Sequence, residues 1–179
     1  MPDIAVSYDP QETSTAIARI ADFLDRYGGR RRVFLLVGPF GSGKSWCLRQ
    51  AGGSDVVNLS AHLALAVKNQ CGERFHEIAS QPRNEAMGFI GEMMRQNFWD
   101  LLTSKDPIFV DSLELLYSYP YFDFVREAES ASEKGSRVIL AIPGYISQGR
   151  IYFIDRNLFN LQIGPTRIDR CFELKGVRE

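Results

Sequence analysis

The stretch "RRVFLLVGPFGSGKSWCL", residues 31–48, combines an apolar run, a glycine-rich segment and a polar-apolar pattern of helical character. Residues 33–37 are apolar at every position, which is typical of a strand that is covered on both faces in a parallel sheet. The apolar run stops at Gly38, and a short segment with helical character, residues 44–51, begins six residues later. The order of strand, glycine-rich loop and helix predicts that the loop lies at the carboxyl end of a buried strand.

The loop itself, "GPFGSGKS" at residues 38–45, matches the pattern GxxxxGK[ST], which is called the P-loop. Its glycines let the backbone curl so that successive N–H groups point inward at phosphate oxygens, and the following helix adds the partial positive charge of its N-terminus. Lys44 is predicted to reach the β- and γ-phosphates of a nucleotide and the Ser45 hydroxyl to bind Mg²⁺. A strand before the loop and a helix after it argue against a chance match. The predicted nucleotide-binding residues are Gly38, Pro39, Phe40, Gly41, Ser42, Gly43, Lys44, Ser45 and Trp46.

A second apolar segment, "PIFVD" at residues 107–111, ends in an acid. Mg²⁺ needs a further oxygen ligand near Ser45, and Asp111 at the end of a predicted strand is the candidate. Its alternative role is to cap the next helix. Many P-loop ATPases orient the attacking water with a Glu directly after this Asp, but Ser112 follows here. If a helix begins at Ser112, Glu114 lies one turn along it, and we predict Glu114 as a catalytic residue with Lys44. The alternative is an ordinary surface acid.

The remaining pattern alternates strands with helices, which predicts a single α/β domain over residues 1–179. We expect a P-loop NTPase fold: a mostly parallel sheet of about five strands, flanked by helices, with short strands in a β-rich C-terminal part. The strand predicted at residues 137–142 should lie between the P-loop strand and the outer strands, as in the additional-strand division of ATPases. Pro143 and Gly144 follow it where such ATPases often carry a polar sensor, which favours slow turnover. Outside the loop and its helix, we expect a helix at 11–27, with Ile17, Ile20, Ala21 and Leu24 at helical spacing, and a helix at 61–80 that is broken near Gly72. The next helix has Pro82 in its first turn and a buried stripe of Met87, Ile90, Met94, Phe98 and Leu101. Further helices are expected at 113–117 and from Pro120 to Gly135, strands at 55–60 and 107–111, and a β-rich part at 149–179 with a turn at Gly164-Pro165.

Composition fits an ordinary globular chain of 179 residues, with 45% hydrophobic and 24% charged residues and a net charge of −1. No apolar stretch is long enough to cross a bilayer, and residues 1–12 lack the regions of a signal peptide. We therefore expect a cytoplasmic protein that does not contact a membrane. The cysteines Cys47, Cys71 and Cys171 follow no metal-binding pattern and are expected to be free thiols.

Charge is unevenly spread along the chain. Residues 137–179 carry seven basic and four acidic residues, whereas residues 72–136 carry six basic and twelve acidic ones. The mildly basic part either faces phosphate or nucleic acid or is a solvated surface, so contact with DNA stays open and is not indicated. P-loop hydrolysis commonly uses an arginine, sometimes from another subunit. The candidates in an ATP-dependent homo-oligomer are Arg150, Arg167 and Arg170.

Three short stretches carry a more particular likeness. "GPFGSGKS", "IFVDSLELL" and a fourth strand that runs into "AIPGY" resemble the BrxF family, the small P-loop proteins of bacteriophage-exclusion (BREX) systems, mainly of type III. The resemblance covers roughly residues 15–175. It implies a cytoplasmic ATP-binding component of a multi-protein antiphage system, which works beside a larger ATPase, a DNA methyltransferase and a phosphatase-like protein.

Three functions stay open from the sequence. The first is a slow, Mg²⁺-dependent ATPase within a larger assembly; adenine is preferred because no guanine-reading NKxD motif is present. The second is a small-molecule or nucleotide kinase, whose lid normally brings several arginines over the phosphates. The segment 61–106 offers only Arg74, Arg83 and Arg95, which argues against a kinase. The third is an interaction module that binds ATP without significant hydrolysis.

Overall fold

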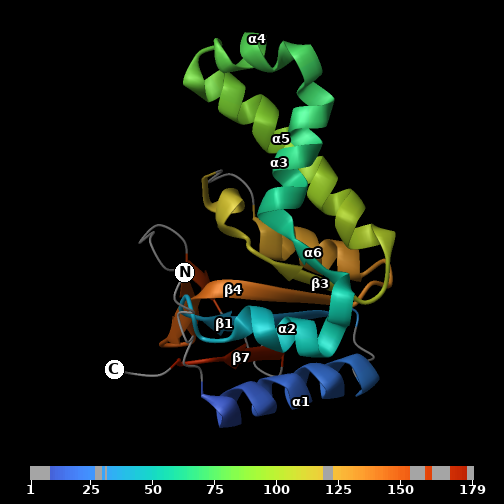
Figure 1. Cartoon of the computed structure of the whole chain (residues 1–179), viewed down its shortest axis with the longest axis vertical. Helices are drawn as coiled ribbons and strands as arrows, with labels where there is room; N and C mark the ends of the chain where they lie inside the picture. The colour runs from blue at the N-terminus through green and yellow to red at the C-terminus, as the bar shows by residue number, and fades with distance from the viewer. Residues whose placement is uncertain are drawn as a thin grey trace, which may run out of the picture.

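The computed structural model describes residues 9–26, 30, 32–118, 123–153, 160–162 and 170–176 (Figure 1). A parallel sheet in the order β2-β3-β4-β1-β7 forms its centre. The mixed α/β architecture and the five parallel strands agree with the prediction from sequence. The parallel strands are β1 (Val33–Gly38), β2 (Val56–Asn58), β3 (Ile108–Asp111), β4 (Val138–Ser147) and β7 (Cys171–Glu173).

Helices cover both faces of this sheet (Figure 1). On one face lie α1 (Pro10–Arg26) and α2 (Lys44–Gly52). On the other face lie α3 (Leu59–Cys71), α5 (Arg83–Ser104) and α6 (Phe124–Ser132). Shorter elements connect them: η1 (Gly53–Asp55), η2 (Gly72–Arg74), α4 (Phe75–Ala79) and the 3₁₀ helix η3 (Glu114–Ser118).

The apolar run of β1 is divided between the two cores by the alternation of side chains along a strand. Leu35 and Val37 pack with α3, α5 and α6, whereas Phe34 and Leu36 pack with α1 and α2. Each strand of the centre needs apolar side chains on both faces, which is why residues 33–37 show no polar position.

Strand order places β4 between β1 and β3. Leu35 pairs with Leu140 of β4, and Leu140 pairs in turn with Val110 of β3. This confirms the position predicted for the strand at residues 137–142. On the other side of β1 lies β7, where Val37 pairs with Glu173. The last stretch of the chain thus adds a parallel strand directly beside the loop-bearing strand.

Strand β4 is longer than predicted. It continues beyond Ile142 through Pro143 and Gly144, and its second half forms an antiparallel hairpin with β5 (Arg150–Phe153), which pairs with β6 (Asn160–Gln162). Gly144 permits the close approach of β5, because a Cβ there would collide with the carbonyl oxygen of Tyr152. Sequence reasoning ended the strand at Ile142 because a proline and a glycine usually interrupt a strand.

The buried face of α1 differs from the predicted one. The residues at helical spacing in the sequence are Ile17, Ile20, Ala21 and Leu24, but only Ile20 of these is fully buried, and Ala21 is exposed. The buried residues are Thr13, Ala16, Ile20 and Phe23. Helical periodicity predicts that one face of this helix is buried. Packing against α2 and Phe34 determines which face that is.

Helices α3 and α5 run side by side away from the sheet and carry α4 at their far end (Figure 1). The break predicted near Gly72 is confirmed, since α3 ends at Cys71. Helix α5 begins at Arg83, so Pro82 is its N-cap residue and not part of its first turn. Of the apolar stripe predicted on α5, Met94 and Phe98 are buried, whereas Met87, Ile90 and Leu101 are half-buried. Among the described helices, none combines the length and the apolar character needed to cross a membrane.

One predicted helix start and one predicted turn lie outside the described residues. These are the helix start at Pro120 and the turn at Gly164-Pro165. The three cysteines are free, as predicted.

Candidate functional site

The glycine-rich loop lies at the carboxyl end of β1, between β1 and α2. Gly41 and Gly43 have φ angles of +78° and +89°, a region that glycine enters without steric cost. Gly38 is required for another reason: a Cβ there would lie 2.5 Å from Ser42 Oγ and 2.7 Å from the carbonyl oxygen of Leu174. Close packing of Gly38 against Leu174, the residue that follows β7, therefore fixes the start of the loop.

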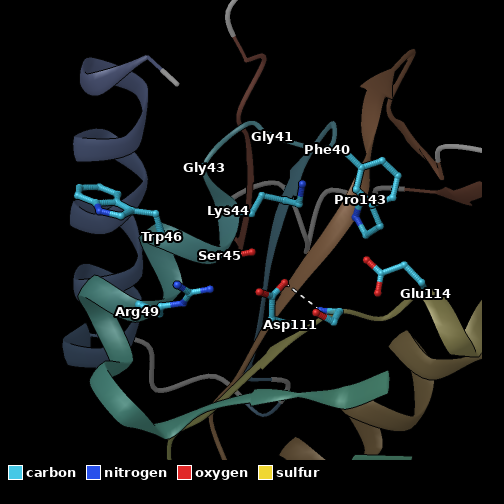
Figure 2. Close-up of a pocket in the computed structure, with 11 residues that line it drawn as sticks. Phe40, Gly41, Gly43, Lys44, Ser45, Trp46, Arg49, Asp111, Glu114 and Pro143 are labelled. Carbon is cyan, nitrogen blue, oxygen red and sulfur yellow. Dashed lines mark hydrogen bonds between the residues drawn. The ribbon is translucent and has the colours of Figure 1, made fainter. Parts of the chain in front are cut away.

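A cavity of about 350 Å³ opens between this loop and the end of β3 (Figure 2). Its walls combine cationic, hydroxyl and carboxylate side chains from β3, α2 and η3. The lining residues are Phe40, Gly41, Gly43, Lys44, Ser45, Trp46, Arg49, Asp111, Ser112, Glu114 and Pro143.

The two predicted catalytic residues and both predicted metal ligands lie around this cavity. Figure 2 shows Lys44 and Ser45 on the loop side, Asp111 opposite them and Glu114 on the far side. Parallel strands bring their carboxyl ends to one edge of the sheet, which is why residues more than sixty positions apart meet here.

Other predicted binding residues have different positions. Gly38, Pro39 and Ser42 do not line the cavity, but form the base of the loop. Trp46 lines it, although Figure 2 shows its indole directed towards α1, and the ring packs against the apolar cluster on that side of the sheet.

The Lys44 ammonium is held by the loop itself. Nζ donates hydrogen bonds to the carbonyl oxygens of Gly38 at 2.7 Å and Pro39 at 2.6 Å, and lies 3.4 Å from Ser42 Oγ. The residue is only 7% exposed. Burial lowers the pKa of Lys44 to about 8, against the opposing effect of the carboxylates of Asp111 and Glu114. Two carbonyl oxygens and a hydroxyl thus fix the cation at the wall of the cavity.

Asp111 ends β3 and lies beside Asn58 of β2 in the sheet register. Its Oδ1 accepts a hydrogen bond from the backbone N–H of Ser112 at 2.9 Å. Ser112 has a φ angle of +60°, which few residues other than glycine adopt. The condition under which Glu114 lies one turn along a helix, a helix start at Ser112, is therefore not met: the segment predicted as helical at 113–117 is the 3₁₀ helix η3, which begins at Glu114, after this left-handed residue.

Glu114 is exposed and occupies the first position of η3. Its neighbours Leu113 and Leu116 are buried and anchor the turn in the core on the α3 side. Figure 2 shows the Glu114 carboxylate facing the same space as Asp111, close to Pro143. Pro143 lies directly beside Gly38 in the sheet register, so an apolar ring, and not a polar sensor, occupies this point of the strand.

Sequence reasoning missed Arg49. It is four residues after Ser45 and hence on the same face of α2, and its side chain points towards Ser45 and Asp111 (Figure 2). Its guanidinium makes no side-chain hydrogen bond or ion pair with any residue that the structure describes. The i, i+4 spacing from Ser45 was the signal that could have found it.

A second cavity of about 350 Å³ adjoins the first at Asp111. It shares Ser45, Arg49, Asp111 and Ser112 with the first cavity, and continues towards the end of β2. Its further lining residues are Gly53, Ser54, Val56 and Asn58.

The three candidate arginines of the C-terminal part are not equivalent. Arg150 is exposed at the start of β5. Arg170 is only 4% exposed, so it is not a surface charge that reaches a neighbouring copy. Arg167 lies outside the described residues.

Comparison with known proteins adds no relative. No family model, no curated protein and no solved structure matches this chain.

Proposed function

We propose that this chain is a P-loop NTPase that binds ATP in the cavity between the glycine-rich loop and Asp111. The single observation that carries the proposal is the convergence of Lys44, Ser45 and Asp111 on one cavity, from the ends of two strands that β4 separates. The P-loop motif alone is short, but the motif together with an acid at the second strand end is the arrangement that Mg²⁺–nucleotide binding requires.

The loop offers the chemistry that a polyphosphate needs. Gly41 and Gly43 have positive φ angles, a conformation that allows successive N–H groups of a loop to point at phosphate oxygens, and α2 begins at Lys44, directly after the loop. Lys44 is the charged donor for the β- and γ-phosphates, and phosphate oxygens would replace the carbonyl oxygens that it now contacts.

The residues present fit Mg²⁺. The Ser45 hydroxyl and the Asp111 carboxylate are hard oxygen ligands on the same cavity. No cluster of three or more His, Cys, Asp and Glu that could hold a metal exists within the described part of the chain. A cation held by one carboxylate and one hydroxyl would depend on the nucleotide phosphates for further ligands, which is a usual binding mode of Mg²⁺. When bound, it would neutralise charge on the phosphates.

We propose slow hydrolysis, with Glu114 as the group that orients water. Its carboxylate faces the cavity, but it is exposed on a 3₁₀ turn and the residue after Asp111 is Ser112. The same two observations favour a second candidate function, an interaction module that binds ATP without significant hydrolysis.

The kinase alternative gains no support from the arm formed by α3, α4 and α5. Arg95 is paired with Glu92, with a guanidinium–carboxylate distance of 2.7 Å, and Arg74 is paired with Glu77 at 3.4 Å. Both arginines are thus engaged on the surface of the arm, and neither lines the cavity.

The wider role rests on the resemblance to BrxF. We propose a cytoplasmic component of a phage-exclusion complex, whose partners are the other proteins of that complex. An ATP-dependent homo-oligomer would supply a further group to the exposed side of the cavity, where Glu114 lies.

The test is calorimetric titration of the purified protein with ATP and GTP in the presence of Mg²⁺, followed by phosphate release with and without a nucleoside acceptor. We expect ATP binding with preference over GTP, and slow release that an acceptor does not change. Absence of ATP binding would overturn the proposal. Binding without release would support the module, and transfer to the acceptor would support the kinase. Molecular mass in solution, with and without ATP and Mg²⁺, tests the oligomer.

A further inference from the structure

Ser60, in the first turn of α3, holds the turn that follows Asp111. Its Oγ donates a hydrogen bond to the carbonyl oxygen of Ser112 at 2.6 Å, and its backbone N–H donates to the same oxygen at 3.0 Å. The Ser60 Oγ also accepts from the backbone N–H of Leu115 at 3.1 Å. One side chain thus bridges both ends of the segment that contains Glu114.

The segment needs such a support because its backbone is unfavourable by itself. Ser112 has a φ angle of +60°, and a left-handed residue other than glycine persists where the surroundings determine it. The Ser112 N–H bonds to Asp111 Oδ1, and the Ser112 carbonyl bonds to Ser60. Both backbone polar groups of the strained residue are therefore used, one to orient the Asp111 carboxylate and one to attach the turn to α3.

The first turn of α3 is itself fixed to the sheet. Asn58, the last residue of β2, pairs with Asp111 in register, and its Oδ1 accepts from the N–H of Ala61. Leu59 and Leu63 are fully buried in the core on this side of the sheet. Ser60 therefore projects from a rigid base and can impose its geometry on the turn.

We propose that Ser60 is a positioning residue for the site: its hydroxyl fixes the left-handed turn at Ser112 so that Asp111 and Glu114 face the P-loop together. The inference rests on the proposed function. It assigns a role at the site to a residue that does not line the cavity, and it makes the first turn of α3 part of the support of the site.

The experiment compares Ser60→Ala, which removes the bridging hydroxyl, with Ser60→Thr, which keeps it. Ser104→Ala is the matched control, because Ser104 also donates to a backbone carbonyl but lies at the exposed end of α5. Three quantities are measured: ATP affinity without metal, the Mg²⁺ concentration that half-saturates the complex, and turnover. Thermal unfolding of each variant is recorded beside them. Amide hydrogen exchange of residues 111–118, in protein without nucleotide, reports the turn directly.

We expect Ser60→Ala to leave metal-free ATP affinity within about twofold, to raise the half-saturating Mg²⁺ concentration several-fold, and to lower turnover about tenfold, the effect of one lost hydrogen bond on the barrier. Exchange in residues 111–118 should become faster. Ser60→Thr should match the wild-type protein in all three quantities, and Ser104→Ala should change none.

Two outcomes overturn the inference alone: a Ser60→Ala variant with unchanged Mg²⁺ dependence, turnover and exchange, or one that loses metal-free ATP affinity in parallel with thermal stability. If the wild-type protein binds no ATP, the proposed function fails first and the inference falls with it.

Discussion

The Lys44 ammonium donates a hydrogen bond of 2.7 Å to the carbonyl oxygen of Gly38, the first residue of the glycine-rich loop. The cation that is expected to meet phosphate thus contacts the backbone that would cradle that phosphate. Nucleotide binding must exchange at least one of the carbonyl contacts of Lys44 for a phosphate oxygen.

Lys44→Ala is expected to lower ATP affinity by roughly ten- to a hundredfold, the range of one hydrogen bond to a charged group. The fold should persist, because the loss removes contacts within the loop only. Calorimetry of ATP binding and thermal unfolding measure the two effects. Lys68→Ala, an exposed lysine on α3, is the control. Equal ATP affinity in Lys44→Ala and wild type would show that Lys44 does not bind phosphate.

The lowered pKa of Lys44 predicts that ATP affinity depends on pH. Because burial lowers its pKa to about 8, the free protein loses this charge as the pH rises through 8, and ATP affinity should fall over the same range. Phosphate favours the charged form, so binding at pH ~9 should take up close to one proton and binding at pH ~7 almost none. Calorimetry in buffers of different ionisation enthalpy measures the uptake. The uptake should vanish in Lys44→Ala, and a proton release at the higher pH would contradict the assignment.

Asp111→Asn should weaken the Mg²⁺ dependence of ATP binding more than ATP binding itself. The amide oxygen can still accept the hydrogen bond from the Ser112 N–H, so the turn is retained while the negative charge at the proposed metal site is lost. Titration of ATP at several Mg²⁺ concentrations tests this. Asp123→Asn, which alters a helix cap of α6, serves as control. A mutant that responds to Mg²⁺ as wild type does would show that Asp111 is no metal ligand.

Glu114→Gln should leave ATP binding intact and slow hydrolysis by roughly a hundredfold or more, the usual contribution of a positioned base. Turnover of the isolated wild-type protein should already be slow, on the order of one per minute, compared with several per second for a typical enzyme. Single-turnover phosphate release measures the rate of hydrolysis in the wild-type protein and in Glu114→Gln. Brisk turnover that survives Glu114→Gln would defeat the expectation of slow hydrolysis and the role of Glu114 together.

Variants of Arg49 and Arg150 test whether an arginine of the same chain or one of a neighbouring copy acts at the site. Arg49 points into the cavity, and Arg150 is exposed on the hairpin. If Arg49 contacts the phosphates or their surroundings, Arg49→Ala should lower turnover about tenfold or more at any protein concentration. If Arg150 acts from a second copy, Arg150→Ala should lower turnover, and a mixture with Lys44→Ala should recover part of it. Unchanged turnover in both variants would exclude both arginines.

Only part of the candidate site could be predicted from the sequence. The P-loop, Asp111 and Glu114 follow from local pattern, because each is defined by neighbouring residues or by the end of an apolar run. Arg49 could have been found from its spacing to Ser45. Ser60 could not, because its contact with Ser112 joins residues 52 positions apart and leaves no periodic trace.

By itself, the sequence determined the strand at residues 33–37, the glycine-rich loop after it and the α/β class. Unbroken apolar runs need cover on two faces, and positive φ angles favour glycine, so both features follow from local residue types. Four features could not be predicted from local residue types: β7 joins the sheet beside β1, α1 buries Phe23 more fully than Leu24, Arg170 is buried, and Ser112 adopts a left-handed turn. Each of these depends on a partner distant in sequence, because packing and hydrogen bonding across the fold stabilise a conformation that the local residue types do not specify.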